Sequence, residues 1–185
     1  MKRILLALVA VFLTGCGVHN EELDRAMELR TQLLATQGCS FEAVVTADYS
    51  DKTYTFTVAY QADNEGNVAF EVREPETIEG ITGTISSEGG KLTFDDKAVA
   101  FELLADGQVT PVSAGYILVK TLRSGYVRGC GTDGDGVKLL IDDSYQEEAL
   151  HLDIRLGQGN TPVSAEILYK DRRFLSLEVK NFCLL

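Results

Sequence analysis

Apolar and polar residues alternate through most of the chain after residue 39, with the period of two that a half-buried β-strand produces. In residues 53–62, for example, Tyr54, Phe56, Val58 and Tyr60 fall on one face. β-Branched and aromatic residues are common in such segments, and short turns separate them, as antiparallel hairpins require. The pattern predicts about eleven short strands, at residues 40–49, 53–62, 68–72, 81–85, 91–95, 98–104, 126–129, 137–142, 150–156, 162–170 and 173–182.

A helical period precedes the first strand. Residues 20–37 begin with Asn20, whose side chain can cap free backbone N–H groups, and continue with two glutamates that suit the positive end of a helix dipole. Gly38 is a natural stop. The apolar stripe that we expect this helix to bury consists of Leu23, Ala26, Met27, Leu33 and Leu34.

A second helical period interrupts the strands in mid-chain. Thr110 and Pro111 are typical of an N-cap and a first helical position, and Gly125 closes the segment. Between them, apolar residues and one threonine repeat at helical spacing: Ala114, Ile117, Leu118, Thr121 and Leu122.

These elements predict an α+β fold. A long series of adjacent antiparallel strands must curl, and helices with apolar faces need a surface to cover. An open antiparallel β-barrel of about eleven strands, with the N-terminal helix and the short mid-chain helix as its lid, satisfies both needs. The apolar residues on its inner surface would either fill a core or line a cavity for an acyl chain. The candidates for a cavity are Tyr54, Phe56, Val58, Tyr60, Ile117, Leu118 and Leu122.

The N-terminus has a different pattern. A short basic head precedes an apolar run at residues 4–13, which is about half the length of a membrane span. Small residues and Cys16 follow it. The segment resembles a bacterial lipoprotein signal peptide with its lipobox, and the resemblance implies that Cys16 is acylated and becomes the mature N-terminus. An ordinary secretory peptide that leaves Cys16 as a structural thiol is the alternative.

This resemblance divides the chain into a signal peptide at 1–15, a lipidated tether at 16–19 and one domain at 20–185. The tether is short, so we expect the domain to lie close to the membrane. The resulting localisation is the extracytoplasmic face of the cell membrane, with the protein held there by lipid.

The net charge of the chain limits the classes of partner that it can bind. Without Lys2 and Arg3, the basic residues fall from 17 to 15 against 28 acidic residues, so the formal net charge changes from −11 to −13. An acidic surface argues against nucleic acid, whose phosphates require Lys and Arg. It also offers no polybasic attachment to anionic lipid. We expect a monomer whose partners are the membrane, through Cys16, and a lipid ligand or an envelope protein.

Three cysteines remain after Cys16, and their spacing is too wide for a CxxC motif: Cys39, Cys130 and Cys183. An exported chain can form disulfides, so one bridge with one thiol left over is possible in three pairings. Three free thiols are the other interpretation.

Catalytic signatures are absent from the sequence. Of the two histidines, His19 lies in the tether and His151 alternates with leucines on a strand, where we expect it to face solvent. Residues 133–136 (Asp-Gly-Asp-Gly) lack the later ligands of a calcium loop and predict a hairpin turn. We therefore expect no enzyme, no cofactor and no metal site.

The order of elements resembles the LolA/LolB-like lipoprotein-carrier superfamily. Residues 67–75 resemble a strand with a trailing proline near the middle of that family's sheet, and residues 161–167 resemble its last hairpin. The resemblance implies an open barrel that binds an apolar ligand, and Cys16 aligns the chain with the tethered members. The strand at residues 46–49 is similar to one in uncharacterised lipoproteins of clostridia-type bacteria.

Two functional hypotheses follow. In the first, a membrane-anchored lipoprotein binds a lipid or acyl chain in its half-barrel. In the second, the curved sheet is a protein-binding scaffold or regulator of a cell-envelope or sporulation enzyme.

Overall fold

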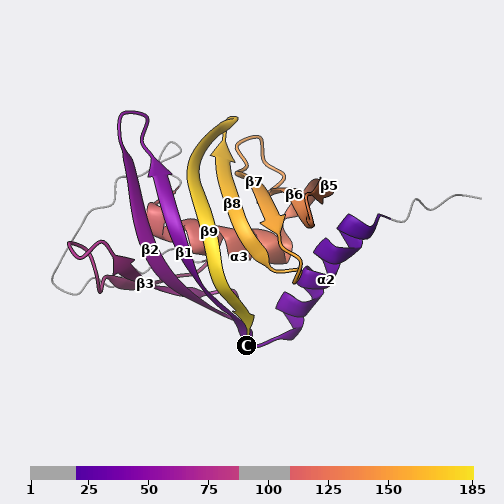
Figure 1. Ribbon diagram of the computed structural model, residues 1–185, viewed down its shortest axis with the longest axis horizontal. Coiled ribbons are helices and arrows are strands. Elements are labelled where there is room, and N and C mark those ends of the chain that lie inside the picture. Colours follow the sequence, from indigo (N-terminus) through magenta and orange to yellow (C-terminus); the bar gives the residue numbers. More distant parts are fainter. Residues whose placement is uncertain (1–19, 88–108) are drawn as a thin grey trace, which may run out of the picture.

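The computed structural model describes residues 20–87 and 109–185. These residues form two α-helices, a 3₁₀ turn and nine strands (Figure 1). In chain order the elements are α2 (Glu21–Ala35), β1 (Gly38–Asp48), β2 (Thr53–Asp63), β3 (Val68–Glu74), β4 (Thr82–Ile85), η2 (Pro111–Ser113), α3 (Ala114–Ser124), β5 (Tyr126–Asp133), β6 (Gly136–Asp142), β7 (His151–Leu156), β8 (Pro162–Tyr169) and β9 (Arg172–Leu184). The strands predicted at 91–95 and 98–104 lie outside the described residues.

All nine strands belong to one sheet, in the order β4-β3-β2-β1-β9-β8-β7-β6-β5. Every neighbouring pair is antiparallel. The chain builds the sheet as two meanders, β1–β4 and β5–β9, which join where β1 pairs with β9. Because β4 and β5 are the two edges, the sheet curves without closing, which confirms the predicted open barrel (Figure 1).

The alternation of apolar and polar residues along the strands gives the sheet two faces of different chemistry. One register row crosses six strands and is buried throughout, with no residue more than 8% exposed: Phe56, Val45, Leu177, Ala165, Ile154 and Leu139. Because successive side chains on a strand point to opposite faces, the next row along lies on the outside. That row is mostly polar: Thr55, Thr46, Ser176, Glu166, Asp153 and Leu140.

Helix α3 covers the inner face of the sheet. It follows the β4 edge in the chain and precedes the β5 edge, so it returns the chain from one side of the sheet to the other. Figure 1 shows it crossing behind β1, β9 and β8. The predicted caps are confirmed, since Thr110 and Pro111 begin the segment and Gly125 ends it. All five predicted stripe residues of this helix are buried.

Helix α2 packs beside the sheet near β5 and β6. Asn20 is its N-cap, as predicted, and accepts a hydrogen bond from the backbone N–H of Leu23 at 2.9 Å. The helix ends at Ala35, two residues earlier than predicted. The reason is that the Gln37 N–H pairs with the Leu185 carbonyl, so the chain has already joined the C-terminal strand.

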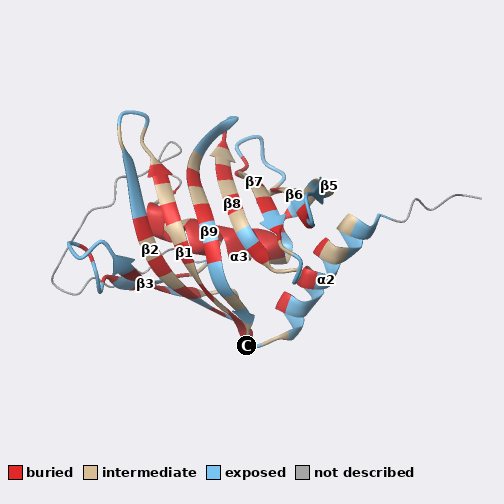
Figure 2. Ribbon diagram, viewed as in Figure 1, coloured by how far each residue is buried: buried red, intermediate tan, exposed pale blue. Residues whose placement is uncertain are grey.

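The buried stripe of α2 differs from the predicted one. Ala26, Leu29 and Leu33 face the protein, whereas Leu23, Met27 and Leu34 are between 38% and 56% exposed. The helix carries two apolar stripes, and only one of them finds a partner in the described residues (Figure 2).

Candidate functional site

The inner face brings together six of the seven residues predicted to line a cavity. Phe56, Val58 and Tyr60 lie on β2, and Ile117, Leu118 and Leu122 lie on α3; all six are buried. Tyr54, at the hairpin end of β2, is 46% exposed and makes an edge contact with Tyr49. The helix therefore lies against the aromatic and aliphatic row of β2. Whether these residues receive a ligand stays a prediction.

Helix α3 approaches the sheet closely at Gly115. A Cβ atom added to this residue would lie 2.4–2.6 Å from three ring carbons of Tyr60. Tyr60 in turn stacks on Phe41 of β1, with ring centroids 5.1 Å apart. Because glycine has no Cβ atom, the first turn of α3 can contact the stacked rings of Tyr60 and Phe41 directly.

Two polar atoms are buried on this apolar surface with no hydrogen-bond partner in residues 20–87 and 109–185, the Tyr60 Oη and the Thr121 Oγ1. Burial raises the pKa of Tyr60 well above its ordinary value, and the nearby Gly115 backbone opposes that rise without making a full hydrogen bond. Buried hydroxyls almost always find partners, so two without partners between one helix and one sheet are unusual.

The C-terminal ends of the two helices are held by each other's arginines. Arg30 of α2 donates from Nε to the Leu122 carbonyl of α3 at 2.7 Å and from a terminal nitrogen to the Gly125 carbonyl at 2.8 Å. Arg123 of α3 donates to the Leu33 carbonyl of α2 at 3.0 Å. The last carbonyls of a helix lack intrahelical partners and carry partial negative charge, so each guanidinium caps the other helix. We call these contacts the arginine clasp.

The clasp is partly removed from water, and burial lowers the pKa of Arg30. Helix α2 has no basic residue in its own last turn, so Arg123 supplies that charge from the other helix. Arg123 also donates to the Asn64 carbonyl at 2.7 Å, in the turn after β2. The clasp therefore joins α2, α3 and the β2–β3 turn, and it fixes the C-terminal end of α3 over the sheet.

Separate bonds hold α2 to the strands. Arg25 donates to the Gly157 carbonyl at 2.9 Å, and the side-chain amide of Asn160 donates to the Arg25 carbonyl at the same distance. At the N-terminal end, the Thr132 hydroxyl donates to Glu22 at 2.7 Å, a bond that lowers the pKa of this carboxyl. These contacts do not involve α3, so they can be changed independently of the clasp.

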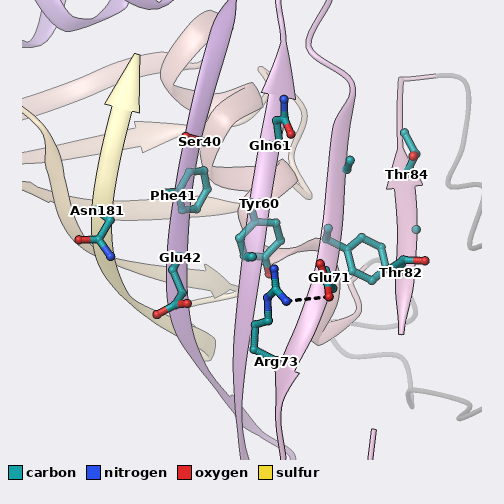
Figure 3. Close-up of a pocket in the computed structure, with 14 residues that line it drawn as sticks. Ser40, Phe41, Glu42, Tyr60, Gln61, Glu71, Arg73, Thr82, Thr84 and Asn181 are labelled. Atoms are coloured by element: carbon teal, nitrogen blue, oxygen red, sulfur yellow. Dashed lines mark ion pairs between the residues drawn. The ribbon is translucent and has the colours of Figure 1, made fainter. Parts of the chain in front are cut away.

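The outer face of the sheet is hollowed where it curves. A shallow depression of about 730 Å³ crosses β9, β1, β2, β3 and β4 (Figure 3). Its floor includes Ala59 and Ala69, and Arg73 pairs with Glu71 at 2.8 Å on its rim. The other polar lining residues are Ser40, Glu42, Gln61, Thr82, Thr84 and Asn181. The sequence analysis missed this site; the outward polar positions of the strands are its only sequence signal.

The other residues singled out in the sequence lie away from the inner face. His151 is on the outer face of β7, as predicted, with 26% of its side chain exposed, and its Nδ1 lies 2.6 Å from Asp142 Oδ1 on the neighbouring strand. Residues 133–136 form the predicted β5–β6 turn, with Gly134 at a φ of +59°. Within residues 20–87 and 109–185 no group of three or more acidic, histidine or cysteine side chains could hold a metal ion.

The cysteine alternatives are resolved in favour of free thiols, since Cys39, Cys130 and Cys183 are all unpaired. Cys39 is buried, whereas Cys183 is exposed. Neither α2 nor α3, the helices of the described part, is long and apolar enough to span a membrane. Cys16 lies outside the described residues.

Comparison with known proteins identifies several solved structures with a similar arrangement of strands and helices. A LolA superfamily protein is among them. A LolA superfamily protein from Nitrosomonas europaea is 10% identical, with a TM-score of 0.45, over 86% of this chain and 93% of that one. A putative outer membrane lipoprotein-sorting protein domain from Vibrio parahaemolyticus is 7% identical, with a TM-score of 0.40, over 88% and 91%.

An uncharacterized conserved protein from Thermus thermophilus is 14% identical, with a TM-score of 0.42, over 89% of this chain and 86% of that one. No protein-family model matches the sequence, and no curated protein matches it. All three TM-scores are below 0.5.

Proposed function

We propose that this chain is a membrane-anchored lipoprotein that binds an apolar ligand, a lipid or an acyl chain, between α3 and the inner face of its half-barrel. In this proposal α3 is a movable cover. Its apolar side chains occupy the inner face when the ligand is absent, and the ligand replaces them when α3 lifts.

The observation that carries the proposal is the unequal attachment of α3. The eleven-residue helix α3 lies over the apolar inner face of the sheet, and η2 and α2 contact the sheet beside it. Among the described residues, the side-chain hydrogen bonds from outside α3 to its backbone come from Arg30 and cluster at its C-terminal end. Among the described residues, the N-terminal turn of α3 packs against Tyr60 and follows the buried η2 turn, which contacts β1. A helix whose polar attachments cluster at one end can lift when those few bonds open.

The unpartnered Tyr60 hydroxyl supports the same proposal. A fatty acid or an ester has one polar group beside a long apolar chain. The Tyr60 O–H would donate to that carbonyl or carboxylate, and the Thr121 hydroxyl would offer a second donor. Sites for such ligands are generally apolar, with a few polar groups that fix orientation.

The anchor rests on the lipobox resemblance at Cys16. Glu21, the first residue of α2, follows Cys16 by five positions, so the tether reaches at most about 18 Å when fully extended. Acylation would therefore keep the apolar inner face close to the lipid that could fill it. This arrangement places the protein on the extracytoplasmic face of the membrane.

Native mass spectrometry of the mature chain with Cys16→Ser tests the ligand directly. This variant has no covalent acyl group, so any lipid mass comes from non-covalent binding. We expect a bound species with the mass of one lipid or fatty acid, and uptake of added palmitate in the ligand-free fraction. Ligand-free protein that takes up no palmitate would contradict the proposal.

The outer depression favours a second candidate, a protein-binding scaffold. A groove lined by hydroxyl, amide and paired charged groups suits a polar partner better than an acyl chain. The variant Arg73→Glu distinguishes the two functions. It should leave lipid uptake unchanged, and it should weaken capture of an envelope partner if the scaffold is the true function.

A further inference from the structure

The exposed stripe of α2 is an apolar surface without a partner in the described structure. Leu23, Met27 and Leu34 follow one another at spacings of four and seven, which puts them on one face of a helix. Their exposed fractions are 38%, 42% and 56%. They lie beside, and not within, the face that Leu29 and Leu33 bury against the protein.

The charged side chains of α2 lie beside this stripe or turn from it. Arg25 and Arg30 both bind backbone carbonyls of the protein, at Gly157 and at α3. At 100° per residue, Glu21 and Glu28 lie about 100–120° from Met27, whereas Asp24 lies about 60° from it, at the edge of the stripe. The stripe is therefore an apolar band with one carboxylate at its edge, and the two arginines of α2 are already bound to backbone carbonyls.

We propose that this stripe lies on the bilayer, with Leu23, Met27 and Leu34 inserted among the lipid chains. The proposal rests on the acylation of Cys16 proposed above and adds an orientation to it. Since the tether reaches at most about 18 Å, the first turn of α2 must stay within about that distance of the membrane surface. An acyl anchor and an amphipathic helix face then act together, as stable peripheral attachment requires.

This contact orients the rest of the domain. Helix α2 lies at one side of the sheet and the β1–β2 hairpin at the opposite end of the molecule (Figure 1). With α2 on the membrane, the β5–β6 side of the half-barrel faces the lipid, and the hairpin that contains Tyr54 points away from it.

A tryptophan placed in the stripe tests the contact. The sequence contains no tryptophan, so the full-length acylated protein with Met27→Trp has a single reporter. Tyr54→Trp is the matched control, because Tyr54 is similarly exposed but lies at the far hairpin. Both proteins are reconstituted into phosphatidylcholine vesicles with and without brominated chains, after their circular dichroism is shown to match that of the wild type.

We expect the Met27→Trp emission to be blue-shifted and quenched about twofold or more by the brominated lipid, while the Tyr54→Trp emission stays unchanged. Equal, unquenched emission from two proteins that float with the vesicles would overturn the helix contact and leave the anchor intact. Blue-shifted emission that brominated lipid does not quench would mean that protein covers the stripe, and would also overturn the proposal. Failure of the wild type to float would instead refute the acyl anchor.

Discussion

The inner and outer faces of the sheet are made by the same strands and have opposite chemistry. The row through Val45 is apolar and buried, and the row through Thr46, one residue further, is polar and contains charged groups. Helix α3 covers the first row, whereas a second open depression, of about 460 Å³ and separate from the one described above, crosses the second row at Asp153, Glu166 and Ser176. The difference shows that the apolar burial of these two rows is confined to one side of the sheet.

The largest expected difference between the faces is in thiol reactivity. Cys39 and Cys183 lie on neighbouring strands, but Cys39 is buried and Cys183 is exposed. Burial raises the pKa of Cys39 to about 11, with Arg123 partly opposing the rise. Iodoacetamide reacts with the thiolate, so a pKa raised from 9.0 to about 11 should slow the alkylation of native Cys39 by about a hundredfold relative to Cys183. Peptide mass spectrometry over time measures both rates.

A control for this comparison is the denatured chain, in which the two rates should become similar. Total thiol counting with and without reductant should give the same number, since the three cysteines are free. Comparable rates in the native protein would show that the inner face is open to solvent.

A smaller effect is expected from Gly115→Ala. The new methyl group would lie 2.4 Å from the nearest Tyr60 ring carbon, so the helix or the ring must move. Such overpacking typically lowers the free energy of unfolding by about 1–3 kcal/mol. Gly131→Ala on β5 is the matched control, since no atom lies within 4 Å of its added Cβ. Urea unfolding of both variants measures the difference, and equal stabilities would refute the close contact between α3 and β2.

The smallest effect is expected on the outer face. Lys138 pairs with Asp153 at 2.8 Å, but the lysine side chain is 48% exposed. Exposed pairs contribute about 0–1 kcal/mol, so Lys138→Ala should change the free energy of unfolding by no more than that. A loss above this range in urea unfolding would mean that the outer face also stabilises the fold.

The pH dependence of this pair has a definite sign. Its hydrogen bond with Asp153 raises the pKa of Lys138 in the folded protein. The contribution of this ion pair to the free energy of unfolding is therefore complete below the unfolded pKa of about 10.4 and is lost as pH rises through the folded pKa. The difference in free energy of unfolding between wild type and Lys138→Ala should stay constant near neutrality and shrink as pH rises through the folded pKa of Lys138.

Much of the fold could be predicted from local pattern. A period of two reports which positions share a face, and each of the nine described strands overlaps a predicted one, although β5 continues to Asp133 where the prediction ended at Gly129. The caps at Asn20, Thr110 and Gly125 could also be predicted, because a cap depends on residues within one turn. The position of α3 against the apolar face of β2 followed from the same amphipathic pattern.

The features that could not be predicted depend on long-range geometry. Arg30 and Arg123 look like surface residues of two separate helices, and only the crossing of α2 and α3 makes them caps for each other. Helix α2 has two apolar stripes, and its sequence alone does not show which of them packs against the rest of the protein. The outer depression is lined by residues of five strands, β9, β1, β2, β3 and β4, which the sheet brings together from distant parts of the sequence. The proposed movement of α3 depends on the arginine clasp, and the proposed membrane contact depends on the exposed stripe of α2.

The most direct test of the central claim, that α3 is a movable cover over an apolar ligand site, weakens the clasp and measures binding. Arg30→Ala removes the hydrogen bonds to α3, and Arg25→Ala, the matched control, removes a similar bond from the same helix to the Gly157 carbonyl. Both are made in the mature chain with Cys16→Ser, and a dansyl-labelled fatty acid is titrated against each.

If the clasp contributes about 1–2 kcal/mol to the covered state, Arg30→Ala should bind the probe roughly five- to thirtyfold more tightly than Arg25→Ala or the unsubstituted background. Equal binding by the Arg30 and Arg25 variants, or no saturable binding by any of them, would contradict the account.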